Sequence, residues 1–257
     1  MTDNAPRELK HPAFLVHSFF GFRDFPALTD AIQKIINALG KPTAFYAGDN
    51  LMSFGKSMSF LDDVPFREAW QKHSETVEER AAMWRRATML WAARTALRLD
   101  GDFVECGCYK GTGPRIIADV LDFGAMDRRY YLYDLFEHNA SMPHHHMIEH
   151  SSELCDWVRA RFADLPNVVI TQGRVPESLA IAAPEKIAFM HLDLNNADAE
   201  IGALEVLFDR IVPGGILLLD DYGWIAYVDQ LRAEKAWFAK RGYHVLELPT
   251  GQGLVIK

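Results

Sequence analysis

Cysteine is scarce in this sequence, which has three in 257 residues: Cys106, Cys108 and Cys155. Cys106 and Cys108 are separated by one residue in a segment that reads as a strand followed by a turn, where a disulfide would be hard to close. An odd and low count is typical of proteins in a reducing compartment. The sequence therefore predicts a fold that is not held by disulfides.

Long apolar runs are also missing. No stretch approaches the roughly 20 apolar residues of a membrane-spanning helix. The first residues, MTDNAPRELKHP, lack the basic segment and apolar core of a signal peptide. These features predict a soluble, cytoplasmic protein with no membrane partner.

Basic clusters are the third absence. The net charge is −8 and no Lys/Arg-rich run occurs, which excludes tight, sequence-independent binding to nucleic acid. Hydrophobic residues make up 49% and charged residues 24%, a globular composition. The length suits one large α/β domain with an extension. Whether the protein forms a homo-oligomer is left open.

Strand and helix patterns alternate from residue 76 onward. A capping box at Thr76 and Glu79 opens a predicted helix over residues 76–99. Strands are predicted near 103–107, 129–134, 168–171, 187–193 and 216–221, with helices between them, and the last two strands, 243–248 and 253–256, form a hairpin. This order predicts a doubly wound α/β domain with a mostly parallel sheet.

The stretch from 187 to 222 is the centre of the predicted domain. It reads as strand, helix, strand, and the two strands end in Asp193 and in Asp220-Asp221. Carboxyl ends of parallel strands form the ligand-binding edge of such sheets. Three carboxylates that converge there repel one another unless a cation or protons lie between them, and Mg²⁺, Mn²⁺ or Ca²⁺ suits such oxygen ligands. The alternative is that each acid merely ends its strand.

A glycine-bearing turn, with Gly107, Gly111 and Gly113, follows the predicted strand at 103–107. It departs from the dinucleotide pattern G-x-G-x-x-G, because an acid, Glu105, precedes the first glycine. An acidic strand end suits the cationic ligand S-adenosylmethionine better than a pyrophosphate. Asp134 lies 27 residues after Gly107, close to the spacing of a ribose-binding acid. The three consecutive histidines at 144–146 favour a solvated loop over a metal site.

Several of these segments resemble the macrocin O-methyltransferase family. Residues 104–111, VECGCYKG, look like its first motif, and residues 133–137, YDLFE, look like its acidic second motif. HLDL at 191–194 and the stretch from PGG at 213–215 to DDYG at 220–223 resemble its metal-binding half. The likeness covers about residues 70–257. It implies a Rossmann-like methyltransferase fold with a seven-stranded sheet and metal-dependent methyl transfer from S-adenosylmethionine to a hydroxyl group of a small molecule, such as a sugar or natural product.

The resemblance also implies roles for individual residues. Asp193, Asp220 and Asp221 are expected to hold Mg²⁺ or another divalent cation, with Asp193 also catalytic. The residues expected to bind the cofactor are Glu105 and Gly107 at its methionine end, Tyr109 and Gly111 in the same turn, Asp134 at its ribose, and Gln172 and Gly173 at its adenine.

One departure concerns the general base. The family usually has a second aspartate where this sequence has Asn195, and an amide cannot take a proton at neutral pH. His191 or His138 is then a candidate base, unless the metal suffices. A catalytically weak cofactor-binding protein is one alternative function, and an NAD-dependent oxidoreductase is a less favoured one.

The predicted domains are an extension with a helical cap or lid at 1–75 and the methyltransferase domain at 76–257. The mixed polar and apolar stretch at 49–60 suits a segment that closes over a site, or equally a loop packed on the surface.

Overall fold

The computed structural model describes residues 13–39, 45–139 and 146–257. The chain divides into two compact units, Met1–Ala87 and Thr88–Lys257. The division falls inside the helix α4 (Met83–Ala96). His144 and His145 of the histidine run lie outside the described residues, while His146 is described and exposed.

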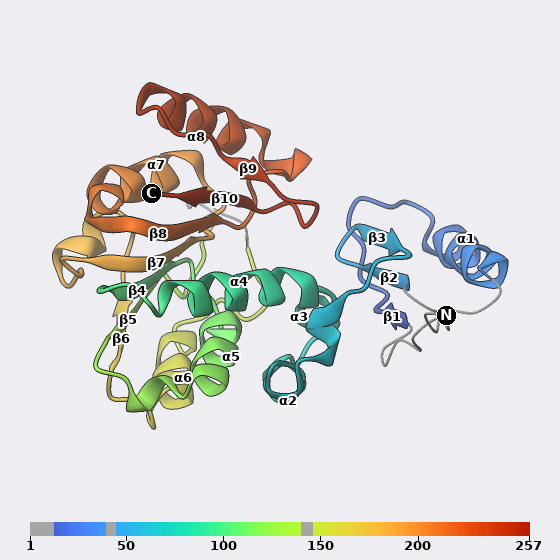
Figure 1. Ribbon diagram of the computed structural model, residues 1–257, viewed down its shortest axis with the longest axis horizontal. Coiled ribbons are helices and arrows are strands. Elements are labelled where there is room, and N and C mark those ends of the chain that lie inside the picture. Colours follow the sequence, from blue (N-terminus) through green and yellow to red (C-terminus); the bar gives the residue numbers. More distant parts are fainter. Residues whose placement is uncertain (1–12, 40–44, 140–145) are drawn as a thin grey trace, which may run out of the picture. The chain divides into compact units, whose positions relative to one another are not determined.

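The first unit contains a small mixed sheet as well as helices (Figure 1). Its strand β2 (Phe45–Gly48) pairs in parallel with β1 (Ala13–Leu15) and antiparallel with β3 (Leu51–Phe54). The β2–β3 turn is tight because Asp49 and Asn50 both take positive φ angles, of 52° and 54°. The remaining elements are α1 (Phe25–Ala38), the 3₁₀ turn η1 (Ser59–Asp62), α2 (Val64–His73) and α3 (Val77–Ala81).

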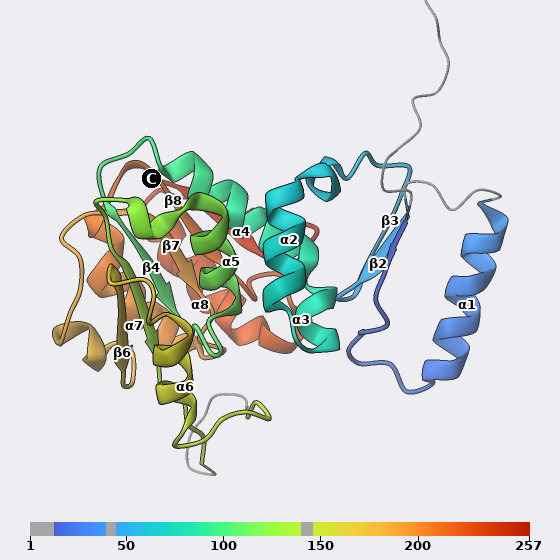
Figure 2. The same cartoon turned by 90° about the horizontal axis from the view of Figure 1, so that it is seen from below.

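The sequence predicted an N-terminal cap built from helices, whereas the structure has a small sheet there as well. Phe45 and Ala47 of β2 pack with Ile32 of α1 and with Phe19, so strands and helix share one small core, and α1 runs alongside the strands (Figure 2). The first part of the predicted lid stretch, at 51–54, is the paired strand β3. Short aromatic strands without alternating polarity gave no strand pattern in the sequence. The predicted boundary at residue 75 stays a prediction.

The second unit is built around seven strands in the order β6-β5-β4-β7-β8-β10-β9. The strands β4 (Asp102–Cys106), β5 (Tyr130–Asp134), β6 (Val168–Gln172), β7 (Ile187–Leu192) and β8 (Ile211–Leu219) are parallel. β10 (Gly253–Ile256) runs antiparallel between β8 and β9 (Leu246–Glu247). The predicted seven-stranded, mostly parallel sheet and its final hairpin are confirmed.

Helices cover both faces of this sheet (Figure 1). The strand order grows outward from β4 in one direction and from β7 in the other, so right-handed crossovers place α5 and α6 on one face and α7 and α8 on the other. The helices are α5 (Thr112–Leu121), α6 (Leu154–Arg161), α7 (Ala197–Leu207) and α8 (Val228–Lys240), with 3₁₀ turns at Phe123–Ala125, Glu177–Ala180, Phe208–Arg210 and Ile225–Tyr227.

The central strands are buried on both faces. All five residues of β5 and all six of β7 are buried, which explains why their sequences do not alternate between polar and apolar residues. The predicted capping box forms, because the Thr76 side chain accepts from the Glu79 N–H and the Glu79 side chain accepts from the Thr76 N–H. Along the described residues, no helix combines the length and the apolar character that crossing a membrane requires.

Candidate functional site

The strand order reverses between β4 and β7, and the predicted site residues lie at the carboxyl ends of these two strands and of their neighbours β5, β6 and β8. Asp193 continues β7, and its N–H donates to the Cys106 carbonyl of β4 at 2.8 Å. Asp220 follows β8, and its N–H donates to the Leu192 carbonyl at 2.8 Å. A reversal of this kind is where open α/β sheets bind ligands.

Gly107 lies against the backbone of Asp193 at this point. A Cβ atom added to Gly107 would stand 1.8 Å from the Asp193 carbonyl oxygen, and the Gly107 φ angle is +87°. Glycine is therefore required both for the close approach of two turns and for the left-handed backbone.

We expect a Gly107→Ala substitution to lower the free energy of unfolding by at least about 2 kcal/mol, since it combines backbone strain with overlap. Gly242→Ala is the matched control, because Gly242 has a φ of +75° but no atom within 4 Å of an added Cβ. Urea unfolding of both variants separates the two costs. Equal losses in both would show that the approach to Asp193 is not tight.

Asp134, at the end of β5, holds the glycine-bearing turn. One of its carboxylate oxygens accepts the Tyr109 N–H at 2.7 Å and the other accepts the Phe136 N–H at 2.7 Å. Tyr109 and Gly111 both have positive φ angles, of 48° and 68°, so the turn curls into the amino terminus of α5. Asp134 therefore sits where it was predicted, with both oxygens also engaged by backbone donors.

A contact that the sequence did not predict ties the next loop to this turn. The Tyr109 hydroxyl hydrogen-bonds to the Glu149 carboxylate, whose other oxygen lies 3.5 Å from the Lys110 ammonium. The Tyr109 ring also meets the His150 ring edge-on at 5.3 Å. The segment that resumes at residue 146 thus contacts the glycine-bearing turn.

Gln172 is the last residue of β6, which pairs with β5 on the side away from β4, and Gly173 follows it. The Gly173 N–H donates to the Asp134 carbonyl at 2.9 Å, and the exposed Gln172 side chain donates to the Leu135 carbonyl at 3.4 Å. Both residues therefore border the Asp134 end of the sheet, at the same edge as the glycine-bearing turn.

A row of buried polar side chains crosses the sheet at the level of the site. His191 of β7 lies between Glu105 of β4 and Asp220, with its Nδ1 3.5 Å from Glu105 Oε2 and its Nε2 3.2 Å from Asp220 Oδ1. His191 is 0% exposed, Glu105 2% and Asp220 3%. Burial alone would lower the pKa of His191, but the charge of Glu105 and the hydrogen bond to Asp220 outweigh it and raise that pKa to about 10.

The ends of this polar row were missed from the sequence. The Tyr130 hydroxyl donates to Glu105 Oε2 at 3.1 Å. The Gln252 amide donates to Asp220 Oδ1 at 2.8 Å and accepts from the Thr250 hydroxyl at 3.0 Å. Gln252 comes 32 residues after Asp220 and reaches it only because β10 pairs with β8. No local pattern marks such a partner.

The three aspartates predicted to hold a metal lie at adjacent strand ends, and their oxygens are of the kind that Mg²⁺ prefers. Asp220 and Asp221 are buried, at 3% and 6% exposure, and Asn195 turns its amide toward Asp193 Oδ1 at 3.4 Å. Within the described ranges no three His, Cys, Asp or Glu side chains are gathered as a metal-binding group. The donor chemistry therefore fits a hard cation, although these carboxylates would have to turn toward one another to share it.

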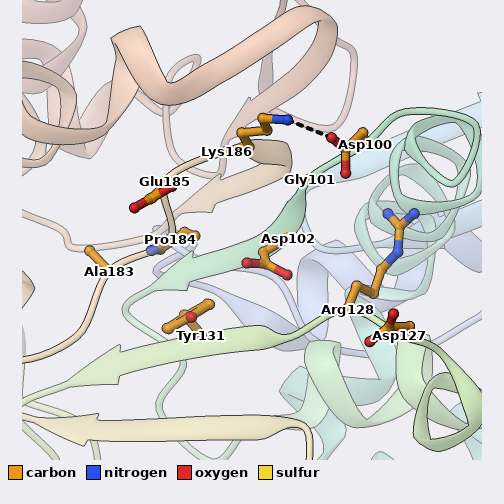
Figure 3. A pocket seen from close by; sticks show the side chains of 10 residues that line it. All are labelled: Asp100, Gly101, Asp102, Asp127, Arg128, Tyr131, Ala183, Pro184, Glu185 and Lys186. Carbon is orange, nitrogen blue, oxygen red and sulfur yellow. Dashed lines mark hydrogen bonds and ion pairs between the residues drawn. The ribbon is translucent and has the colours of Figure 1, made fainter.

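A separate hollow of about 440 Å³ lies at the opposite, amino-terminal edge of the strands (Figure 3). Its lining includes Asp100, Asp102 and Lys186, and none of the predicted site residues. Lys186 pairs with Asp100 at 2.6 Å, and Asp102 accepts the Arg129 N–H at 2.7 Å. Since these groups already hold each other and the switch point lies at the other edge, the carboxyl edge is the candidate active site.

Known structures share this architecture. The O-methyltransferase NovP is 18% identical with a TM-score of 0.57, over 69% of this chain and 81% of that chain. The TDP-rhamnose 3′-O-methyltransferase CalS11, from calicheamicin biosynthesis, is 16% identical with a TM-score of 0.54, over 91% and 96%. The Podospora anserina methyltransferase PaMTH1 bound to S-adenosylhomocysteine is 12% identical with a TM-score of 0.55, over 93% and 97%. At these identities the likeness establishes the fold.

No curated protein sequence matches the chain. The family model described as macrocin-O-methyltransferase (TylF) matches residues 92–241, which is more than half of the chain and includes every predicted site residue. This match agrees with the motif resemblance and sets aside the NAD-dependent oxidoreductase. The chain belongs to the macrocin-O-methyltransferase family and is an S-adenosylmethionine-dependent O-methyltransferase.

Proposed function

We propose that the protein methylates a hydroxyl group of a small molecule, a sugar or a natural product, with the help of a divalent cation. In this reaction the acceptor oxygen forms a bond to the methyl carbon as the carbon–sulfur bond of S-adenosylmethionine breaks. The products are a methyl ether and S-adenosylhomocysteine, and the hydroxyl proton has to leave. The observation that carries the proposal is the contact between the Gly107 turn and Asp193 at the strand-order reversal.

We assign the cofactor to the β4 side of this point. Glu105 and Gly107 would face its methionine end, and the amino terminus of α5 at Gly111 favours its carboxylate. Asp134 would accept hydrogen bonds from the ribose hydroxyls, with Tyr109 beside it. Gln172 and Gly173 would border the adenine, because they lie at the carboxyl end of the next strand, β6.

We assign the cation to Asp193, Asp220 and Asp221 on the β7 and β8 side. A divalent cation bound there would lower the pKa of the acceptor hydroxyl and fix the oxygen in line with the methyl group. Asp220 is kept in place by His191 and Gln252. Asn195 contributes an amide donor to Asp193 in the place of a proton-accepting carboxylate.

We propose that His191 organises the site and that another group takes the proton. It is 0% exposed, and its two ring nitrogens face the carboxylates of Glu105 and Asp220, so neither nitrogen is directed at an acceptor hydroxyl. His138, the other candidate, follows β5 at the same edge of the sheet, with the His146 ring 5.1 Å away. His138 is therefore better placed than His191 to accept the proton of the acceptor hydroxyl.

Transfer of a labelled methyl group tests the proposal. We expect label from S-adenosylmethionine to appear in a hydroxylated acceptor drawn from a panel of nucleotide sugars and glycosylated natural products, with loss of product on chelation. Asp221→Asn is expected to lower the rate at least about 100-fold, because loss of a residue that only supports a metal ligand already costs about 10–100-fold and a direct ligand should cost no less. Asp229→Asn, at an exposed acid of α8, is the control.

A catalytically weak cofactor-binding protein is the second candidate, favoured by the amide of Asn195 beside Asp193. Binding of S-adenosylhomocysteine without transfer of label to any acceptor, at saturating Mg²⁺, would support it. Product that forms equally well with a chelator present would contradict the assignment of the cation.

A further inference from the structure

Two glutamates meet in the interior beside the candidate site, on facing helices. Glu200 of α7 and Glu234 of α8 are both 0% exposed. Neither Glu200 Oε2 nor either carboxylate oxygen of Glu234 has a hydrogen-bond donor among the described residues. Two carboxyl groups in contact can bond only by sharing a proton, and burial together with the charge of Glu200 raises the pKa of Glu234 to about 11. The pair therefore carries one proton at neutral pH.

Glu200 also reaches out of the pair toward the candidate site. Its Oε1 accepts the Leu194 N–H at 2.9 Å. Leu194 directly follows Asp193 and precedes Asn195, whose φ angle of +54° lies in the left-handed region that asparagine enters more readily than most residues. Glu200 therefore fixes the turn that connects β7 to α7.

The other charged groups nearby belong to the site itself. The negative charge of Asp221 helps to raise the pKa of Glu234. Asp220 raises the pKa of Glu200 and His191 lowers it, both less than burial does. The glutamate pair thus lies within electrostatic reach of the strand ends that bear Asp220 and His191.

We propose that Glu200, held by Glu234, is a positioning residue that fixes the turn after β7 and thereby aims the Asp193 carboxylate. Its place at the site rests on the proposed function, whereas the pinning of the turn does not. Asn196 begins α7 by capping the Ala199 N–H at 2.9 Å, so the turn is bounded by a helix cap on one side and by β7 on the other. Between these two ends of the turn, Glu200 is the one described residue seen to accept the Leu194 N–H.

The test compares four variants by hydrogen exchange of the Leu194 amide and by Mn²⁺ titration. Glu200→Ala removes the acceptor, and we expect exchange at Leu194 to become at least about tenfold faster and Mn²⁺ binding to weaken about 10–100-fold. Glu200→Gln keeps an oxygen for Leu194 and supplies a donor to Glu234, so it should behave as the unmodified protein. Binding of S-adenosylhomocysteine should be unchanged in both.

Two further variants test whether the losses come from the missing contact to Leu194 and not from a general disturbance of α7. The double variant Glu200→Met and Glu234→Met keeps the volume without buried polar groups, should fold, and should show the same two losses. Glu205→Ala, on the same helix, removes contacts to Trp237 and Arg241 and should show neither. Normal Leu194 exchange in Glu200→Ala and in the double methionine variant would overturn the proposal, as would a Glu200→Gln variant that binds Mn²⁺ as poorly as Glu200→Ala.

The outcomes also separate the two proposals. If the unmodified protein binds no Mn²⁺, the cation assignment fails. Leu194 exchange then still decides whether Glu200 holds the turn. If Mn²⁺ binds and Glu200→Ala changes neither measurement, the positioning role fails while the assigned cation site stands.

Discussion

A His191→Leu variant is expected to lose about 3–5 kcal/mol of unfolding free energy, the usual cost of removing one partner from a buried ion pair. The substitution leaves Glu105 and Asp220, at 2% and 3% exposure, without the cation between them. Denaturant unfolding at pH 7 measures the loss. His244→Leu, at an exposed histidine, is the control and should change stability by no more than about 0.5 kcal/mol.

The same variant should lose a pH dependence. The pKa of His191 is raised from 6.5 to about 10 on folding, so the folded state binds the extra proton between these values. Its stabilising contribution is complete below about pH 6.5 and declines as pH rises toward 10, by about 1.4 kcal/mol per pH unit. In the His191→Leu variant, the free energy of unfolding should lack this part of its dependence on pH. A variant that keeps the stability and slope of the unmodified protein but loses activity would instead identify His191 as the base.

An Asp134→Ala variant is expected to lose most of the thermal stabilisation that S-adenosylhomocysteine gives. A ligand at a hundredfold excess over its dissociation constant stabilises the folded state by about 2.7 kcal/mol. The substitution would remove the proposed ribose acceptor and the carboxylate that holds the Tyr109 and Phe136 amides. Melting curves with and without ligand measure the difference.

Asp102→Ala is the matched control for this variant. Asp102 also accepts a backbone N–H, from Arg129, but it stands at the amino-terminal end of β4. Its loss should leave the ligand-induced shift intact. An undiminished shift in a folded Asp134→Ala protein would remove Asp134 from the cofactor site.

The sequence predicted the sheet of the second unit and the positions of its acids, because both follow from local patterns. Alternating apolar strands and patterned helices fix the α/β order, and that order puts Asp134, Asp193 and Asp220 at one edge. The sheet of the first unit was missed, since β1 has three residues and β2 is a run of four buried ones. Such short segments lack the period that identifies a strand.

The supporting residues were harder to find than the acids they support. Glu200 and Glu234 sit on helices with other charged residues, and an acid on a helix usually faces solvent. Their burial depends on how α7 packs against α8, which no spacing in the sequence records. Gln252 likewise meets Asp220 only through the pairing of β10 with β8. The sequence therefore predicted which strands carry the chemistry, while the packing determines what holds those side chains in place.

The polar row that runs from Tyr130 through Glu105, His191 and Asp220 to Gln252 also bears on how this protein can change over evolution. Each member comes from a different strand or its end, and each loss leaves a buried neighbour without its partner. Single substitutions along the row are therefore expected to lower stability, while replacing both members of a contacting pair by apolar groups of similar shape should cost much less. We therefore expect related sequences to keep all of these residues, or to replace contacting residues of the row together.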